Sequence, residues 1–130
     1  MSYELTSSEM SAVSMLSPEG RYDYFVAKVA GNREIWSLEG DDGWVVMRSA
    51  DGDGCVPSWP HADFAAQWAD GDWAGCRPAA IELDAWMERW TPGMEQDGTL
   101  LAVFPDEEGE GTIVTPTELH ASIEGALKKQ

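Results

Sequence analysis

Four residues in one short stretch have the side-chain types that hydrolytic chemistry uses: Cys55, Ser58, His61 and Asp63. A catalytic nucleophile needs a histidine base and an acidic residue that orients the base, all within hydrogen-bond reach of one another. In this chain all four residues fall where we expect a strand to turn directly into a helix. The glycine-rich elbow that exposes a nucleophile is missing there. We therefore expect His61 to be an exposed residue of a first helical turn, and Cys55 to fill the core.

Metal ligands are also present, but their spacing is unsuited to a metal site. Zinc could draw on Cys55, Cys76, His61 and His120, yet no two of them are spaced two to four residues apart. Residues 51–54 begin like a calcium-binding loop but lack its third acidic position and its distal glutamate. We interpret residues 51–54 as a turn, and we expect no metal and no other cofactor.

The chain has seven tryptophans among its 130 residues, and the sequence surroundings of six of them define two groups. Those at apolar helix or strand positions are predicted to lie in the core: Trp36, Trp59, Trp86 and Trp90. Trp44 and Trp73 lie at acidic turns, and a tryptophan exposed there could fill a partner's pocket or stack on a sugar. The candidate partner-binding residues are Trp44, Trp73, Asp41, Asp42, Asp70 and Asp72. The alternative for both tryptophans is a loop side chain folded back on the core.

The charge of the chain is strongly one-sided: 24 acidic against 8 basic residues, a formal net charge of −16. Such a field repels nucleic acid and anionic membranes, so we expect neither as a partner. Two interpretations of the acidity stay open. It either keeps the protein dissolved or attracts a basic protein partner.

Several signals predict a cytoplasmic protein. The first four residues lack the charged and apolar regions of a secretion signal, and no apolar run approaches the roughly 18 residues that cross a bilayer. Cys55 and Cys76 form no spaced motif, so they are predicted to be reduced thiols.

The elements that must position these residues follow from periodicity and capping signals. A helix pair over residues 8–16 and 17–31 precedes three short strands in a meander, over 34–38, 44–48 and 55–59. A helix starts at Pro60, and Pro57 favours an edge strand or a bulge. The chain continues with a strand over 79–83 and a helix that is capped by Asp84 and broken at Pro92. It ends with a strand pair over 100–104 and 112–114 and a closing helix from Thr115.

These elements predict one α+β domain over residues 1–130. We expect one mixed sheet of five or six strands, with an N-terminal helix pair, two crossover helices and a C-terminal helix. The crossovers at 55–83 and 79–104 should be right-handed if they join parallel strands.

Short motifs extend along most of the chain: Trp36-Ser37-Leu38, Val56-Pro57-Ser58-Trp59-Pro60, Asp63-Phe64-Ala65, Ile81-Glu82-Leu83-Asp84-Ala85-Trp86, Trp90, Asp97-Gly98, Val103-Phe104-Pro105 and Thr115-Pro116-Thr117-Glu118-Leu119. Together they resemble a bacterial family of small proteins known as domain of unknown function 2750. The part from Val56 onward is also similar, more distantly, to the N-terminal domain of SseB-like proteins. The first resemblance implies an α+β protein, the second a role beside secretion or other effector systems, and neither implies catalytic residues.

The function that these observations favour is a non-enzymatic cytosolic module, with an immunity or regulatory role, that binds a basic protein. The alternative is a small-molecule or carbohydrate binder, or a hydrolase, with a Trp-lined cleft near His61 and Asp63. The sequence indicates no oligomeric state.

Overall fold

The computed structural model describes residues 6–40, 43–48, 54–68, 75–105 and 112–128. The helical elements are α1 (Ser7–Ser14), α2 (Pro18–Asn32), α3 (Ala62–Trp68), α4 (Leu83–Ala85), the π-helical turn η2 (Trp86–Trp90), α5 (Thr91–Asp97) and α6 (Pro116–Lys128). The strands are β1 (Glu34–Gly40), β2 (Gly43–Trp44), β3 (Met47–Arg48), β4 (Gly54–Ser58), β5 (Arg77–Glu82), β6 (Leu100–Val103) and β7 (Thr112–Val114). The predicted α+β class is confirmed.

The described strands form two sheets, so the single mixed sheet that we expected is wrong. One sheet has the order β2-β1-β5 and is antiparallel throughout. The other has the order β3-β4-β6-β7, and β4 and β6 are its parallel pair. Residues 44–48, predicted as one strand of a meander, are divided between the two sheets as β2 and β3.

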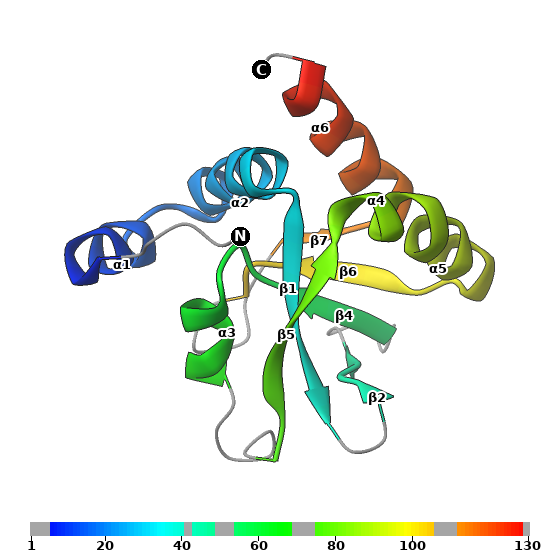
Figure 1. The fold of residues 1–130 in the computed structure, drawn as a ribbon, viewed down its shortest axis with the longest axis horizontal. Helices are drawn as coiled ribbons and strands as arrows, with labels where there is room; N and C mark the ends of the chain where they lie inside the picture. Colours follow the sequence, from blue (N-terminus) through cyan, green and yellow to red (C-terminus); the bar gives the residue numbers. More distant parts are fainter. Residues whose placement is uncertain (1–5, 41–42, 49–53, 69–74, 106–111, 129–130) are drawn as a thin grey trace.

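The helices lie around the crossing strands on three sides (Figure 1). α2 and α6 pack together at one end, while α3 and the α4–α5 segment lie on opposite sides of the strands. The helices at 62–68 and 83–97 connect strands of different sheets. Right-handed crossovers were expected only where these segments join parallel strands of one sheet. Neither segment does so.

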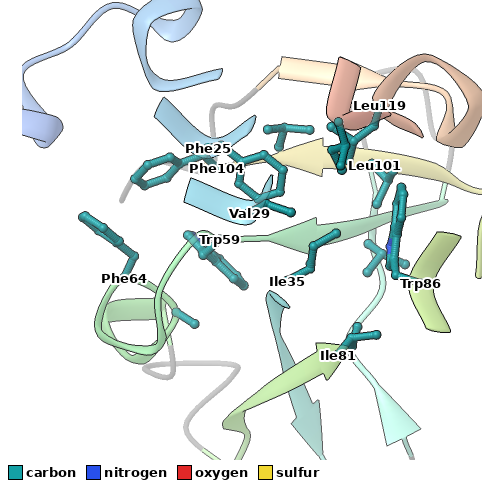
Figure 2. Packing of buried hydrophobic residues seen from close by; sticks show 14 of the residues in the cluster. Phe25, Val29, Ile35, Trp59, Phe64, Ile81, Trp86, Leu101, Phe104 and Leu119 are labelled. Carbon is teal, nitrogen blue, oxygen red and sulfur yellow. The ribbon is translucent and has the colours of Figure 1, made fainter. Parts of the chain in front are cut away.

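The core forms where the helices meet both sheets. Figure 2 shows side chains from α2, β1, β6 and α6 converging there, with Trp59 and Trp86 among them. Trp59 and Trp86 are the two largest fully buried side chains in the described part of the chain. Both were predicted to be core residues, and both predictions are confirmed.

The N-terminal helix pair follows its capping signals. Ser17 caps α2 by accepting the Gly20 N–H at 3.1 Å, and Pro18 occupies the first turn, where its missing N–H costs nothing. Arg33 then adopts a left-handed conformation, φ 60°, and its N–H bonds to the Val29 carbonyl. That turn ends α2 and directs the chain into β1.

Pro57 lies in a strand with neighbours on both sides, so the expectation of an edge strand is wrong. β3 pairs only with Gly54 and Cys55, however, and its ladder ends before Pro57. On that side the Ser37 hydroxyl donates to the Pro57 carbonyl at 2.7 Å. Because a side chain, not a backbone carbonyl, faces this position, the missing N–H of Pro57 breaks no ladder bond.

The segment from Leu83 to Asp97 is one helical path whose middle turn is wider than an α-helix. The Thr91 N–H bonds to the Trp86 carbonyl, five residues back, which defines the π turn η2. Proline lacks an N–H, and its ring clashes with the carbonyl four residues before it, so the wide turn immediately before Pro92 accommodates the ring. The predicted break at Pro92 is thus a π turn, and Gly98, at φ 72°, ends the path as expected. The predicted Asp84 cap is not formed, because the helix already begins at Leu83.

We expect Trp86→Ala to lower the free energy of unfolding by about 3–5 kcal/mol, the usual cost of removing a large aromatic side chain from a core. Trp86 is 1% exposed. Urea denaturation measures the change. Glu88→Ala, at an exposed position of the same turn, is the control and should change stability by no more than about 0.5 kcal/mol. A Trp86→Ala midpoint equal to that of the wild type would contradict the packing.

Candidate functional site

The strand-to-helix corner uses His61 as a helix cap. The His61 carbonyl accepts the Ala65 N–H, and its Nδ1 accepts the Asp63 N–H at 3.0 Å. The side chain is consequently drawn inward and His61 is only 8% exposed, so our expectation of an exposed residue is wrong. The Asp63 carboxylate stays largely in solvent, with Oδ2 3.8 Å from His61 Nδ1.

The two nucleophile candidates of the corner are inside the protein. Cys55 and Ser58 are 0% and 1% exposed, and both belong to β4. Successive side chains of a strand point to opposite faces, so two residues three positions apart lie on different faces. Cys55 is the small core residue that we expected. The structure therefore gathers His61 and Asp63 at the start of α3 and places the two nucleophile candidates on opposite faces of a buried strand.

Trp44 is less exposed than we expected. It is half-buried and packs edge-to-face on Trp90, with ring centroids 5.0 Å apart and an interplanar angle of 79°. We call Trp44 and Trp90 the tryptophan pair. Trp36 and Trp90, predicted to be core residues, are half-buried and pack against the core from its margin. The remaining candidates, Trp73, Asp41, Asp42, Asp70 and Asp72, lie outside the described residues.

A charged row continues from Trp44 across the first sheet. Glu39 pairs with Trp44 on β2 and with Arg77 on β5, so the three side chains share one face. Arg77 Nη2 lies 3.0 Å from Glu39 Oε1, and the Arg77 side chain is 64% exposed. Trp44 thus has the Glu39–Arg77 ion pair beside it on the sheet and the Trp90 ring packed edge-to-face against it.

Exposed carboxylates are frequent along the helical path that carries Trp90. Four of them belong to α4, η2 and α5: Asp84, Glu88, Glu95 and Asp97, and we call this path the acidic helical segment. Arg89 is the only basic residue in this segment, all of which is described. The candidate site is the half-buried tryptophan pair at the margin of the core, with one of its rings on a helical segment rich in carboxylates.

Metal chemistry finds no support in the described part of the chain. No group of three or more His, Cys, Asp or Glu side chains there could hold an ion. The calcium-like segment 51–53 lies outside the described residues. Cys55 and Cys76 form no disulfide. Within the described ranges, moreover, no helix is both long and apolar enough to cross a bilayer.

Sequence reasoning missed a polar contact line between α5 and α6. Glu95 Oε1 accepts from the Thr117 N–H at 2.9 Å and from the Thr117 hydroxyl at 2.6 Å, and these hydrogen bonds lower the pKa of Glu95. One turn further along, His120 Nδ1 lies 3.3 Å from Thr91 Oγ1. The Thr115-Pro116 helix start could have given a hint, since it leaves first-turn N–H groups that need acceptors.

The fold and the patch together define an acidic α+β protein with an aromatic surface pair. Residues 22–123 match the family described as "Protein of unknown function (DUF2750)", and the chain belongs to this family. The resemblance seen in the sequence motifs is thereby confirmed, while the likeness to SseB-like proteins stays a prediction. No curated protein matches the chain.

Glu95 predicts an acid-sensitive contribution to stability. The pKa of its carboxyl is lowered from the usual 4.5, because Thr117 donates two hydrogen bonds to the charged form. This stabilisation should be complete above about pH 5 and disappear as the pH falls through the lowered pKa. Urea denaturation of wild type and Glu95→Gln across this range measures it. The difference in unfolding free energy between wild type and Glu95→Gln should close on acidification. Asp97→Asn should differ less from wild type. A Glu95→Gln gap independent of pH would contradict the role.

The two thiols should react at different rates in the native protein. Cys55 is 0% exposed, whereas Cys76 is partly accessible at the margin of the core. Alkylation without reductant, followed by mass spectrometry, should modify Cys76 first, and both residues once the protein is unfolded. If a thiol still resists alkylation in the unfolded protein, it is oxidised, which would contradict the free thiols of the structure.

Proposed function

We propose that this chain is a non-enzymatic protein-binding module, of an immunity or regulatory kind, whose partner is a basic protein. The observation that carries the proposal is the acidic helical segment, which contributes Trp90 to the tryptophan pair, in a chain of formal net charge −16. The four carboxylates of that segment belong to exposed residues, and the segment contains the single basic residue Arg89.

The charge would act mainly on the rate of encounter. A surface of one sign accelerates the approach of an oppositely charged partner, and it disfavours partners of like charge. Exposed ion pairs at the rim of such a complex add little to its affinity, because water and salt screen them. The lifetime of the complex must therefore come from apolar contact.

The tryptophan pair supports that second requirement. Tryptophan is enriched among the residues that dominate binding energy, typically where surrounding contacts exclude water. Trp44 and Trp90 are each half-buried, so each ring keeps accessible surface while its orientation is held by the other ring and by the core. A pre-oriented ring loses little conformational freedom on binding.

Association should slow as salt is raised from about 50 mM to about 500 mM, because added ions shorten the range of the attraction. The partner is first captured by cross-linking to the tagged chain in its native cells, and kinetics are then measured with both proteins purified. Asp84→Asn/Glu88→Gln should slow association. The matched control Glu19→Gln/Asp23→Asn removes the same charge from exposed positions of α2 and should slow it less.

Trp44→Ala should act on the other rate constant and speed dissociation about tenfold or more, as truncation of an anchor residue does. The variant must first show the wild-type circular dichroism spectrum, because Trp44 also supports Trp90. An acidic partner, or an association rate that is indifferent to salt, would overturn the proposal.

A further inference from the structure

Strand β5 is an outer strand of its sheet and runs directly into α4 (Figure 1). It has six residues, whereas β2, β3 and β7, the other outer strands of the two described sheets, have two or three. An outer strand presents backbone N–H and C=O groups to which another extended segment can bind. Arg77, Ala80 and Glu82 of β5 are exposed, so solvent reaches this strand along its length.

The hydrogen bonds of β1 determine which backbone groups of β5 point outward. Trp36 of β1 exchanges both of its backbone hydrogen bonds with Trp59, on the side away from β5. In an antiparallel pair, two directly opposite residues bond either both toward each other or both away from each other. Ala80 is opposite Trp36, so its N–H and C=O point to the outer edge of the sheet. Pro78 and Glu82, two positions away on either side, point the same way.

The residues of β5 limit where a further strand can pair. Pro78 has no N–H, and its carbonyl can only accept. Beside it, the guanidinium of Arg77 is held by Glu39 at 3.0 Å. Charged side chains and proline are the usual features of edges that resist pairing. The other half of the strand lacks them, and there Ala80 offers both backbone groups and Glu82 its N–H.

The rows of side chains across the sheet indicate what an added strand should carry. Glu34 lies directly opposite Glu82, and two like charges in one row repel each other. A cation beside Glu82 would offset this repulsion. In the next row the small Ala80 lies opposite half-buried Trp36, which leaves room for an apolar side chain. These two rows share one face, so the cation and the apolar residue must be two positions apart in the added strand.

We propose that the outer edge of β5 binds an extended basic segment of the partner protein. The segment adds an antiparallel strand to a sheet that is antiparallel throughout, with a lysine or arginine beside Glu82 and an apolar residue beside Ala80. This inference rests on the proposed function, because it names the part of a basic partner that binds. It places that segment on the same sheet as Trp44.

A second copy of this chain is a poorer occupant of the edge. If β5 paired with itself around Ala80, Pro78 of each copy would lie opposite Glu82 of the other. The missing N–H of proline would then cost a ladder bond at both ends. Each copy also carries a formal net charge of −16, so the two copies repel each other.

The first test uses a synthetic peptide with blocked ends, Lys-Thr-Val-Thr-Leu, whose lysine, valine and leucine share one face of a strand. It is titrated into the full chain and followed by NMR of the backbone amides. The Ala80 and Glu82 N–H signals should shift most, and exchange of the Ala80 N–H should slow about tenfold or more at saturation. The permuted peptide Thr-Val-Lys-Leu-Thr, in which lysine and the apolar residues lie on opposite faces, should bind more weakly.

Methylation of the peptide backbone decides between strand addition and mere charge attraction. A methyl group on the valine nitrogen removes the N–H that donates to the Ala80 carbonyl, and binding should weaken about fivefold or more. The same group on the nitrogen of the following threonine points away from β5 and should change binding little. Equal binding of the two methylated peptides would overturn the proposal. So would protection of the Ala80 N–H that rises with protein concentration alone, since a second copy would then occupy the edge.

Variants of β5 extend the test to the captured partner. Ala80→Pro removes the outward N–H without removing a β1 ladder bond, and it should weaken the complex about fivefold or more. Ala80→Ser keeps the N–H and a small side chain, and should bind like the wild type. Glu82→Gln should weaken binding about two- to fivefold, the range for an exposed ion pair. If folded Ala80→Pro binds normally while Trp44→Ala still speeds dissociation, this inference is wrong and the proposed function stands.

Discussion

Two backbone hydrogen bonds join the two sheets, and the arrangement of the whole protein depends on them. The Trp36 N–H donates to the Trp59 carbonyl at 3.0 Å, and the Trp59 N–H donates to the Trp36 carbonyl at 2.8 Å. This bridge connects β1 of one sheet to the residue that follows β4 of the other. The fully buried Trp59 ring packs against Trp68 of α3, with ring centroids 5.6 Å apart, and its indole N–H donates to the Pro105 carbonyl at 3.3 Å. The start of α3, and with it the His61 corner, is positioned from this point.

The features that could be predicted from the sequence are those that neighbouring residues determine. Ser17 and Pro18 start α2, and Thr115 and Glu118 form a reciprocal capping box, because each signal is complete within one helical turn. The division of residues 43–48 between two sheets was not predictable in this way. The division arises because β2 pairs with β1 and β3 pairs with β4, and β1 and β4 belong to different sheets. The alternation of apolar and polar residues in the segment would be the same for one strand as for two.

The candidate site shows the same limit. Trp44 follows acidic residues in the sequence, a pattern that predicted an exposed ring, but its burial depends on Trp90, in a helical turn far along the chain. His61 likewise has the sequence surroundings of an exposed first-turn residue. It is buried because its ring accepts a backbone N–H of α3, while its neighbour Trp59 anchors the corner in the core. Exposure is a tertiary property at both positions, and a local pattern cannot supply it.

The strand order has a consequence for how the chain folds. β1 pairs with β5 and β4 pairs with β6, so the two pairings interleave along the chain: β4 lies between β1 and β5, and β5 lies between β4 and β6. A contiguous fragment that holds all the strands of one sheet also contains a strand of the other, so whichever sheet forms first encloses a strand that has not yet met its partner. Because distant segments must meet before the β1–β5 and β4–β6 ladders offset the lost chain entropy, folding should be slow for a chain of this size and cooperative across both sheets.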